Sequence, residues 1–482
     1  MKNSNSAVLS IGVALLPIIF LVLLLSINVF IYGDDSLNGT NQFILILSGL
    51  FGASIGFIYK VSYKKILISI SNSVKSVTGA LLILLFVGAL AGTWMISGII
   101  PAMVYYGLKI LDPNIFLPAC IIICSIISVA TGSSWTTSAT VGIALVGIGK
   151  ALGIPAGMVG GAVIAGAYFG DKLSPLSDTT NLAAAVTKVD LFKHIKYLTY
   201  TTIPSISITL IVFIILGFLQ VSDGTTDNTY LLNAISEKFN ISLVLFIVPL
   251  LVLIMIVKKT PPLIALVIGT LAGALFSLIF QPQIINELSG GTNFSIVDSY
   301  IVIMDTITGE INIETNNMIL NDLFSTGGML GMMNTIFLVI GTMVFGGVMD
   351  AIGALKSISK ALLKWADTTF KLFASTVTSC LALNVSASDQ YLSIVVSGKM
   401  FEEAFKDRDL APENLSRTLE DSATVTSALI PWNSCGAYHS SVLGVSVGEY
   451  FIYAIFNWIS PFMTLLYAAL RIKIRTLGIK NQ

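Results

Sequence analysis

Apolar stretches close to twenty residues long recur from one end of the 482-residue chain to the other. A helix needs about 20 such residues to cross the hydrocarbon core of a bilayer. Only 11% of the residues are charged, whereas soluble globular proteins have about 25%. The sequence therefore predicts an all-α polytopic membrane protein that lies in a lipid bilayer.

Twelve apolar segments are long enough to be read as spans, and two further pieces, at 139–149 and 390–398, are too short to cross alone. We expect these two pieces to be re-entrant arms, because irregular backbone at membrane depth is tolerated only inside protein or beside a cavity. The first span is read as a retained helix, since it is too long for a signal peptide and lacks a small-x-small cleavage site. The expected spans are 7–32, 42–59, 77–100, 114–130, 155–170, 198–219, 241–257, 262–280, 327–349, 372–384, 422–433 and 449–470.

The loops between these spans differ in charge. Basic residues cluster near 60–65, 188–196, 258–259, 356–371, 399–417 and 471–480, whereas 33–41, 221–228 and 281–326 are acidic. The last of these segments holds six acids and no Lys or Arg. Because cytoplasmic loops are enriched in Lys and Arg, we expect both termini to be cytoplasmic and 281–326 to be external.

Polar and apolar motifs occur in the same order in the two halves of the chain. LFVGALAGTW, TGSSWTTSAT and GDKLSPLSDTTN in the first half are matched by LVIGTMVFGG, NVSASDQYLS and EDSATVTSALIPWN in the second. The charge pattern makes the span at 77–100 run outward and its counterpart at 327–349 run inward, so the two copies are inverted. Inverted repeats with broken helices that hold substrate near the midplane are typical of secondary transporters. The expected divisions are N-terminal helices (1–65), a first repeat (66–220), connecting helices with an external loop (221–326), a second repeat (327–470) and a cytoplasmic tail (471–482).

Each half has two polar interruptions within apolar sequence, at 131–137 and 171–181 and at 384–389 and 421–433. Pro175 and Pro431 lie in two of them, and proline breaks the helical hydrogen-bond ladder. The freed carbonyls, with Ser, Thr, Asn and Asp oxygens, suit a hard cation such as sodium. A solvent-exposed turn is the alternative for any single cluster, but four clusters in a repeated order favour a site.

Acids inside the membrane are costly and are functional by default. Those expected to bind sodium and protons in turn are Asp178 and Asp389, which lie within Ser/Thr-rich breaks, and then Asp171 and Asp421, for which a structural role is the alternative. We expect Lys172 to pair with Asp171. The expected oxygen ligands of sodium are Thr131, Ser133, Ser134, Thr137, Ser177, Asn181, Asn384, Ser386, Ser388 and Asn433, with Asn181 and Asn433 at matched places.

Several other classes of function find little support. The formal net charge is zero, so bulk charge does not favour nucleic acid, and no GxxxxGK[ST] motif indicates an ATP-driven pump.

Asp350, at the end of an apolar span, is a weaker candidate for ion binding than the other intramembrane acids. Packing roles are expected for Trp135, His194, His439, Cys120, Cys124, Cys380 and Cys435. No cofactor is expected beyond the transported sodium and protons.

The stretch GDKLSPLSDTTNLAAAV, with GTWMISGIIP, TGSSWTTSATVG and IPWNSCGA, resembles the NhaC-type sodium/proton antiporter family over roughly residues 75–465. The resemblance implies an elevator-type carrier with paired re-entrant hairpins, a homodimer, and a place in the cytoplasmic membrane of a prokaryote. Members of that family exchange sodium for protons alone, or exchange malate and protons for sodium and lactate.

We therefore expect a secondary antiporter that exchanges sodium for protons and is not an enzyme. A sodium- and proton-coupled carboxylate exchanger is the alternative, and its anion would be held by helix N-termini and hairpin amides. A cation channel is the rival from another class, because it would share the broken helices and need no titrating acid. An intramembrane hydrolase is the third class, and the sequence has no HExxH motif to support a metalloprotease.

Overall fold

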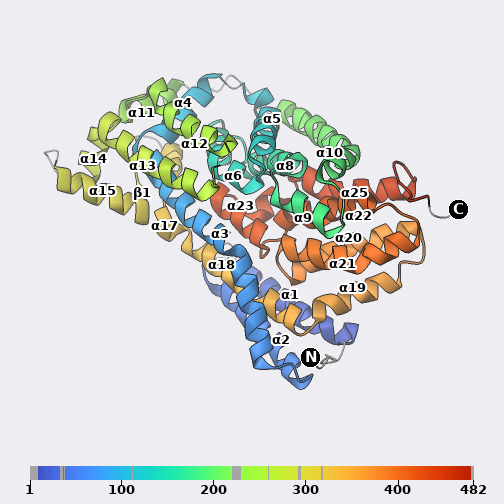
Figure 1. Ribbon diagram of the computed structural model, residues 1–482. Coiled ribbons are helices and arrows are strands. Elements are labelled where there is room, and N and C mark those ends of the chain that lie inside the picture. Colours follow the sequence, from blue (N-terminus) through green and yellow to red (C-terminus); the bar gives the residue numbers. More distant parts are fainter. Residues whose placement is uncertain are drawn as a thin grey trace.

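The computed structural model describes residues 9–32, 36, 38–110, 112–219, 229–258, 260–290, 295–315 and 318–478. The acidic loop at 221–228, Lys259, the end of the C-terminal tail and part of 33–41 lie outside the described residues. Nearly all of the rest is helical (Figure 1). One small antiparallel strand pair, β1 (Ile311–Asn312) with β2 (Ser325–Thr326), places Ile311 opposite Thr326.

Seven helices among the described residues are long and apolar enough to cross a membrane. An eighth span results if α11 (Thr229–Lys238) and the segment Leu243–Val257, which meet at 84°, count as one. The seven are α1 (Ile11–Tyr32), α2 (Thr40–Ile58), α3 (Tyr63–Ile96), α5 (Pro113–Thr131), α10 (Leu191–Leu219), α13 (Pro262–Phe280) and Gly328–Ala351, which comprises α17 (Gly328–Gly331) and α18 (Met333–Ala351).

The expectation of twelve spans is therefore too high for the described residues. Three expected spans are helices of 15 to 18 residues with more polar content or less length: α8 (Ala156–Leu173), α20 (Thr369–Ser386) and α25 (Ile455–Ala469). The expected span at 422–433 is wrong. There the chain forms a π-helical turn, η4 (Glu420–Thr424), a 3-10 turn, η5 (Ser427–Leu429), and a proline-containing break.

The short arms expected at 139–149 and 390–398 both exist as helical segments. The first is the π-helical turn η2 (Ser138–Gly142) with α7 (Ile143–Ala151). The second is longer than expected, because α21 (Gln390–Asp407) has 18 residues and extends into the basic segment 399–417. The length of this helix was underestimated because it carries polar residues, which face protein and not lipid, and these lower its apolar content.

The remaining helices connect and cover these elements. They are α4 (Ile99–Ile110), α6 (Ser134–Thr137), α9 (Asp178–Val186), the 3-10 turn η3 (Leu243–Phe246), α12 (Ile247–Val257), α14 (Pro282–Leu288), α15 (Ile296–Thr308), α16 (Met318–Leu323), α19 (Ala354–Lys364), α22 (Pro412–Leu419), α23 (Ser434–Leu443) and α24 (Val447–Phe451).

Local sequence fixes where many of these helices begin. The hydroxyl of Ser62 accepts a hydrogen bond from the Lys65 amide at the start of α3, and the carboxylate of Asp112 accepts one from the Asn114 amide ahead of Pro113. Both residue types satisfy amides that a helix leaves unpaired in its first turn. Proline is favoured at the first helical position, where no amide is needed.

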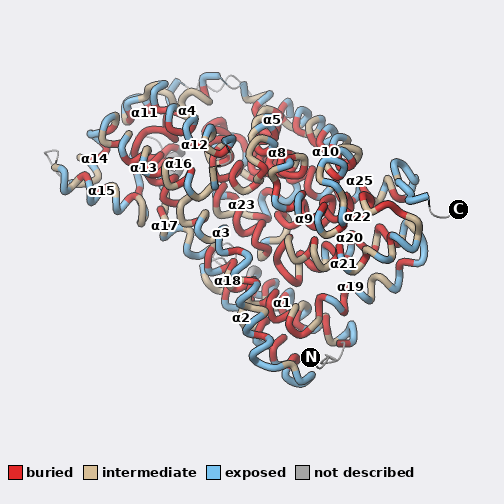
Figure 2. The backbone as a smooth tube through the Cα atoms, in the orientation of Figure 1, coloured by how far each residue is buried: buried red, intermediate tan, exposed pale blue. Residues whose placement is uncertain are grey.

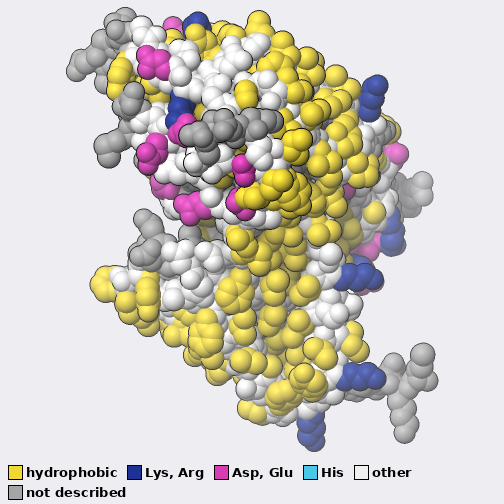
Figure 3. Space-filling view, turned by 90° about the vertical axis from the view of Figure 1, so that its left-hand side faces the viewer, with side chains coloured by type: hydrophobic (Ala, Val, Ile, Leu, Met, Phe, Trp, Pro, Cys, Tyr) yellow, Lys and Arg dark blue, Asp and Glu magenta, His cyan; other side chains and the backbone are white. Residues whose placement is uncertain are grey.

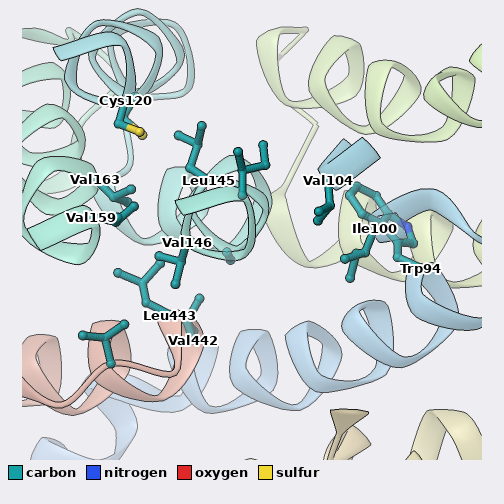
Figure 4. Close-up of a cluster of buried hydrophobic side chains, with 14 of the residues drawn as sticks. Trp94, Ile100, Val104, Cys120, Leu145, Val146, Val159, Val163, Val442 and Leu443 are labelled. Carbon is teal, nitrogen blue, oxygen red and sulfur yellow. The ribbon is translucent and has the colours of Figure 1, made fainter. Parts of the chain in front are cut away.

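The largest apolar core joins α3, α5, α7, α8 and α23 (Figure 4). Val159 and Val163 of α8 lie opposite Cys120 of α5 and beside Val146 of α7 in this view. Helices α5 and α8 approach so closely that a Cβ at Gly166 would lie 2.4 Å from the Ile121 carbonyl oxygen. Small residues permit this approach, as is common where membrane helices pack.

A second core lies in the lower part of Figure 1, where α1, α2, α18 and α19 pack together. A third links α20, α21 and α22. Buried residues concentrate in the middle of the molecule, whereas the outer helices are largely exposed (Figure 2). Exposed side chains such as Phe30, Ile215 and Leu271 are large and apolar, which is expected of a surface that faces lipid.

Figure 3 shows a broad hydrophobic surface. The Asp and Glu side chains visible there gather mainly toward the left, and the visible Lys and Arg lie mainly along the right and lower right. This separation of charge across an apolar belt agrees with the sequence-based separation of acidic and basic loops.

Candidate functional site

A cavity of about 450 Å³, called here the central cavity, lies where α3 meets polar breaks from both halves of the chain. Its wall combines residues of α3, both sides of the α5–α6 and α8–α9 breaks, the start of α13, and the starts of α21 and α23. The lining residues are Ser76, Val77, Gly79, Ala80, Ile83, Thr131, Gly132, Ser133, Trp135, Thr136, Asp171, Leu176, Asp178, Thr179, Ile256, Thr260, Pro261, Pro262, Gln390, Tyr391 and Ser434.

The break between α5 and α6 presents backbone amides to a buried acid. Gly132 adopts a left-handed conformation (φ 71°), and the Ser133 hydroxyl then accepts a hydrogen bond from the Thr136 amide at 3.1 Å. The amide and hydroxyl of Ser134 donate to Asp171 Oδ2 at 3.1 and 2.7 Å. Asp171 thus ties the end of α8 to this break.

The break between α20 and α21 has the same backbone form. Ser388 is left-handed (φ 56°), and Asp389 then caps α21 by accepting from the Leu392 amide at 2.9 Å through Oδ1. Asp389 is 1% exposed, and its Oδ2 has no hydrogen-bond partner among the described residues. An unpaired buried carboxylate oxygen is costly, so this atom marks Asp389 as a candidate to bind a proton or a cation.

Asp178 lies in the third break, between α8 and α9. Ser177 caps α9 by accepting from the Thr180 amide at 3.3 Å, and Asp178 is the first residue of that helix. Its side chain is exposed and lines the central cavity. Asn181 donates to the Pro175 and Ser177 carbonyl oxygens at 2.9 and 2.7 Å. Asn181 therefore satisfies the carbonyl oxygens of Pro175 and Ser177 within this break.

The fourth break, at 430–433, leads into α23. Asn433 caps this helix by accepting from the Cys435 amide at 3.0 Å, and its own amide group donates to the Asn384 carbonyl oxygen at 3.0 Å. The Ser434 amide donates to the Ser388 carbonyl oxygen at 3.0 Å. These bonds join the two polar interruptions of the second half directly.

The four breaks correspond in pairs at a constant spacing. Each pair of like positions is 256 residues apart: 132 with 388 and 133 with 389 in the left-handed turns and caps, and 175 with 431 and 177 with 433 in the proline breaks. At this spacing Asn433 is paired with Ser177, which is also a helix-cap residue, and not with Asn181, with which the order of the motifs had matched it. Order alone could not set this register, because the polar clusters differ in length.

Lys172 pairs with Asp421, and its expected pairing with Asp171 is wrong. Both side chains are fully buried, and the Thr464 hydroxyl donates to the other oxygen of Asp421. Consecutive residues on a helix point in different directions, so Lys172 faces η4 while Asp171 faces the break at Ser134. Asp421 is held in an ion pair and does not line the central cavity.

Several other predicted ligands do not line the cavity and donate hydrogen bonds within the protein. Thr137 donates to the Ser133 carbonyl oxygen, and Ser386 donates back to Ala382 within its helix. Asn384 donates to the Ala423 carbonyl and the Thr426 hydroxyl, but its Oδ1 has no partner among the described residues. Of the predicted residues, only Thr131, Ser133, Asp171 and Asp178 line the cavity.

Sequence reasoning missed several polar residues of the cavity wall and one further buried acid. Gln390, Tyr391 and Thr136 line the cavity directly. Glu420 is fully buried in η4, and neither of its carboxylate oxygens has a partner among the described residues. Its position beside Asp421, just before the expected span at 422–433, was a signal for the same class of role.

Packing was expected for Trp135, the two histidines and the four cysteines. The histidines and cysteines are buried, and Trp135 is partly buried. Trp135 stacks on Tyr438 at 4.0 Å between ring centroids. His439 meets the Ser138 hydroxyl at 2.9 Å. The four cysteines are buried and unbonded to one another, and Asp350 accepts from Ser69 away from the cavity.

Comparison with known proteins places this arrangement in a family. Residues 166–472, which hold three of the four breaks, match the model of the Na+/H+ antiporter family. The chain belongs to this family. That confirms the resemblance drawn from the motifs.

Relatives of known name cover nearly the whole chain. It is 37% identical to the Na+/H+ antiporter NhaC of Alkalihalophilus pseudofirmus over 89% of this chain and 90% of the relative. It is 36% identical to the malate-2H+/Na+-lactate antiporter of Bacillus subtilis over 92% of this chain and 90% of that one. The chain is 34% identical to the Na+/H+ antiporter NhaC of Bacillus subtilis over 85% of this chain and 87% of that relative.

Proposed function

We propose that this family member is a secondary antiporter that exchanges sodium for protons. The observation that carries the proposal is the central cavity, where Asp171 and Asp178 face oxygen-bearing residues of both halves. Among its described lining residues there are two acids and no Lys or Arg. Such a wall favours a cation.

Asp178 is the residue that we propose sodium and protons share. It is exposed to the cavity, whereas Asp171 is held by Ser134 and Asp421 by Lys172. A carboxylate that binds either a proton or a sodium ion, and not both, couples the two movements, because each ion displaces the other. Asp389 is the second candidate, since one of its oxygens is buried and has no hydrogen-bond partner among the residues that the structure describes.

A carboxylate exchanger of the malate/lactate type is the second proposal, and it rests on the 36% identical relative of that name. The volume of the central cavity, about 450 Å³, lies within the range of small-molecule sites and exceeds what a bare ion needs. The absence of a cationic residue among its described lining residues argues against it, because Lys172 is turned to Asp421.

One experiment separates these proposals. Purified protein in liposomes would be loaded with a pH-sensitive dye, and sodium, potassium, malate or lactate would be added outside. Proton movement driven by sodium alone supports the antiporter. Movement that requires malate or lactate selects the carboxylate exchanger, and sodium flux without protons selects a channel and refutes both.

The inverted repeat and the elevator mechanism are part of the proposal. The constant spacing of 256 residues between like positions supports the repeat. The cavity lies between α3, which we propose is stationary with α18, and the polar breaks, which we propose move together. The two repeats would be 66–220 and 327–470, flanked by 1–65, 221–326 and 471–482.

Membrane location, orientation and oligomeric state are also part of the proposal, and they rest on the family and the charge pattern. We propose that the protein lies in the cytoplasmic membrane with both termini inside, and that it is a homodimer as the resemblance implies. Structures in two states in which the four breaks separate from one another would contradict the common moving unit.

A further inference from the structure

A second cavity of about 450 Å³, called here the basic pocket, lies between the start of α10 and the C-terminal segment. Its wall includes Lys193, Lys196, Tyr197 and Tyr200 from α10, and Lys473 and Arg475 from beyond α25. It shares no lining residue with the central cavity. The proposed transport mechanism does not use it.

Positive charge in this pocket exceeds the negative charge that meets it. Lys193 and Arg475 share one carboxylate, Glu413, which Arg475 contacts at 3.0 Å. Lys196 and Lys473 are exposed and form no ion pair within the described residues. The Lys473 ammonium lies 5.2 Å from the centre of the Tyr200 ring.

A fifth cationic residue, Arg417, contacts the wall of the pocket without lining it. Arg417 is fully buried, and its guanidinium lies 4.6 Å from the centre of the Tyr197 ring. Its Nη1 donates to the Lys473 carbonyl oxygen at 3.4 Å, but Nε and Nη2 have no partner among the described residues. Buried arginine nitrogens without partners favour an anion nearby, because desolvated charge is costly unless it is paired.

The pocket is held in shape by the fold. The Tyr197 hydroxyl lies within hydrogen-bond distance of the Lys473 carbonyl and of Asn414 Oδ1, and the Arg475 amide donates to the same hydroxyl at 3.3 Å. The Arg475 carbonyl accepts from the Ala411 amide at 2.9 Å. The C-terminal segment is therefore fixed over α10.

The pKa of the Glu413 carboxyl reflects the positive charge around the basic pocket. Burial by itself would raise the pKa of this carboxyl, but the hydrogen bond from Lys193 and the charges of Lys193 and Arg475 hold it below its ordinary value. The surroundings thus stabilise negative charge.

The position of the pocket indicates where its anion comes from. Phe192, beside Lys193, is 69% exposed at the start of a helix that is long and apolar enough to span the membrane. Tyrosine and lysine residues near such a helix end, here Tyr200 with Lys193 and Lys196, are typical of the membrane–water interface. We infer that the basic pocket binds a phosphate-bearing anion, supplied by the headgroup of an anionic phospholipid.

Native mass spectrometry of the purified full chain tests this inference. After delipidation, protein would be titrated with phosphatidylglycerol or with phosphatidylcholine, and bound lipid would be counted. The variant Lys196→Gln/Lys473→Gln removes two cations that form no ion pair with any described residue, so the fold should survive. Each lysine near a membrane surface contributes about 1 kcal/mol of attraction, so phosphatidylglycerol should bind about tenfold to thirtyfold more weakly.

The matched control is Lys356→Gln/Lys360→Gln on α19, which removes the same charge from exposed positions that also form no ion pair within the described part of the chain. This control should keep wild-type lipid binding. An equal loss in both variants would reduce the effect to general surface charge and overturn the pocket. Equal binding by wild type and Lys196→Gln/Lys473→Gln would also overturn it.

A thermal-shift arm separates the sources of the phosphate. If the lipid is the ligand, phosphatidylglycerol should raise the unfolding temperature of wild type and inorganic phosphate should not. Equal stabilisation by inorganic phosphate, lost in Lys196→Gln/Lys473→Gln, would keep the phosphate chemistry and overturn the lipid as its source. Neither readout depends on sodium/proton exchange, so failure here leaves the proposed function untouched.

Discussion

Lys172 and Asp421 form a fully buried ion pair that joins α8 to η4 across 249 residues of sequence. The Thr464 hydroxyl donates to the second oxygen of Asp421, and the ring of Phe456 lies 5.5 Å from the ammonium group. Helix α25, which carries both of these residues, thus completes the surroundings of the pair. The pair therefore links a helix of the first half of the chain to a π-helical turn of the second half.

Breaking this pair should destabilise the protein strongly. Asp421→Asn leaves the Lys172 ammonium buried without a counter-charge, and such changes cost about 3–5 kcal/mol. The double variant Lys172→Met/Asp421→Asn removes both charges and should recover most of the loss. Thermal unfolding in detergent would measure both, with Thr464→Val as a milder control. Equal stability of Asp421→Asn and wild type would refute a structural role for the pair.

Asp178→Asn should abolish both sodium binding and sodium-driven proton release, because an amide cannot titrate. Asp178→Glu should keep weak exchange, since the charge survives while its distance from the cavity wall changes. In wild type the apparent sodium affinity should fall as the pH falls, because protons compete for the same carboxylate. Calorimetry and a pH-sensitive dye would measure the two ions separately.

The control for Asp178 is Asp350→Asn, which changes an acid that accepts from Ser69 away from the cavity. It should exchange as wild type does. Full exchange by Asp178→Asn would contradict the assignment and transfer the role to Asp389.

Glu420→Gln tests the acid that sequence reasoning passed over. Its oxygens are buried and have no hydrogen-bond partner in the described part of the chain, so we expect the carboxyl to hold a proton that is part of the exchange. The variant should keep sodium binding and release fewer protons for each sodium ion bound. Proton release on sodium addition in weak buffer would show this. A wild-type proton yield would assign Glu420 to packing.

Residues 399–417 and 281–326 should lie on opposite sides of the membrane. Cysteines placed at Lys406, which is exposed, and at Ser289 should react with an impermeant thiol reagent from opposite sides. The four native cysteines are buried and should give little background. Labelling from one side only would remove the basis of the inverted orientation.

Glu413→Gln should lower stability at neutral pH. The folded-state pKa of Glu413 is below its ordinary value, so the carboxylate stabilises the fold above the unfolded-state pKa of about 4.3. This contribution is lost as the pH falls through the folded-state value. The difference in unfolding temperature between variant and wild type should therefore shrink in acid. A constant difference across pH would show that charge is not its cause.

The sequence by itself determined the membrane class, the family and the places where helices break. Hydropathy is a property of each segment, so the long spans α1, α2, α3 and α13 could be located without any tertiary contact. Proline, and left-handed positions such as Gly132, mark the breaks because their backbone preferences are local. Family membership followed from motifs around these breaks.

Only the tertiary structure decided which polar groups meet. The pairing of Lys172 with Asp421, the bond from Ser134 to Asp171 and the unpaired oxygens of Asp389 and Glu420 depend on contacts between segments far apart in the chain. Apolar content also misjudged individual segments. The length of α21 was underestimated because this helix packs inside protein and carries polar residues, whereas the mixed segment 422–433 was read as a span and is broken. A side chain's partner depends on the direction in which its helix presents it, and that direction is fixed only when the helices pack.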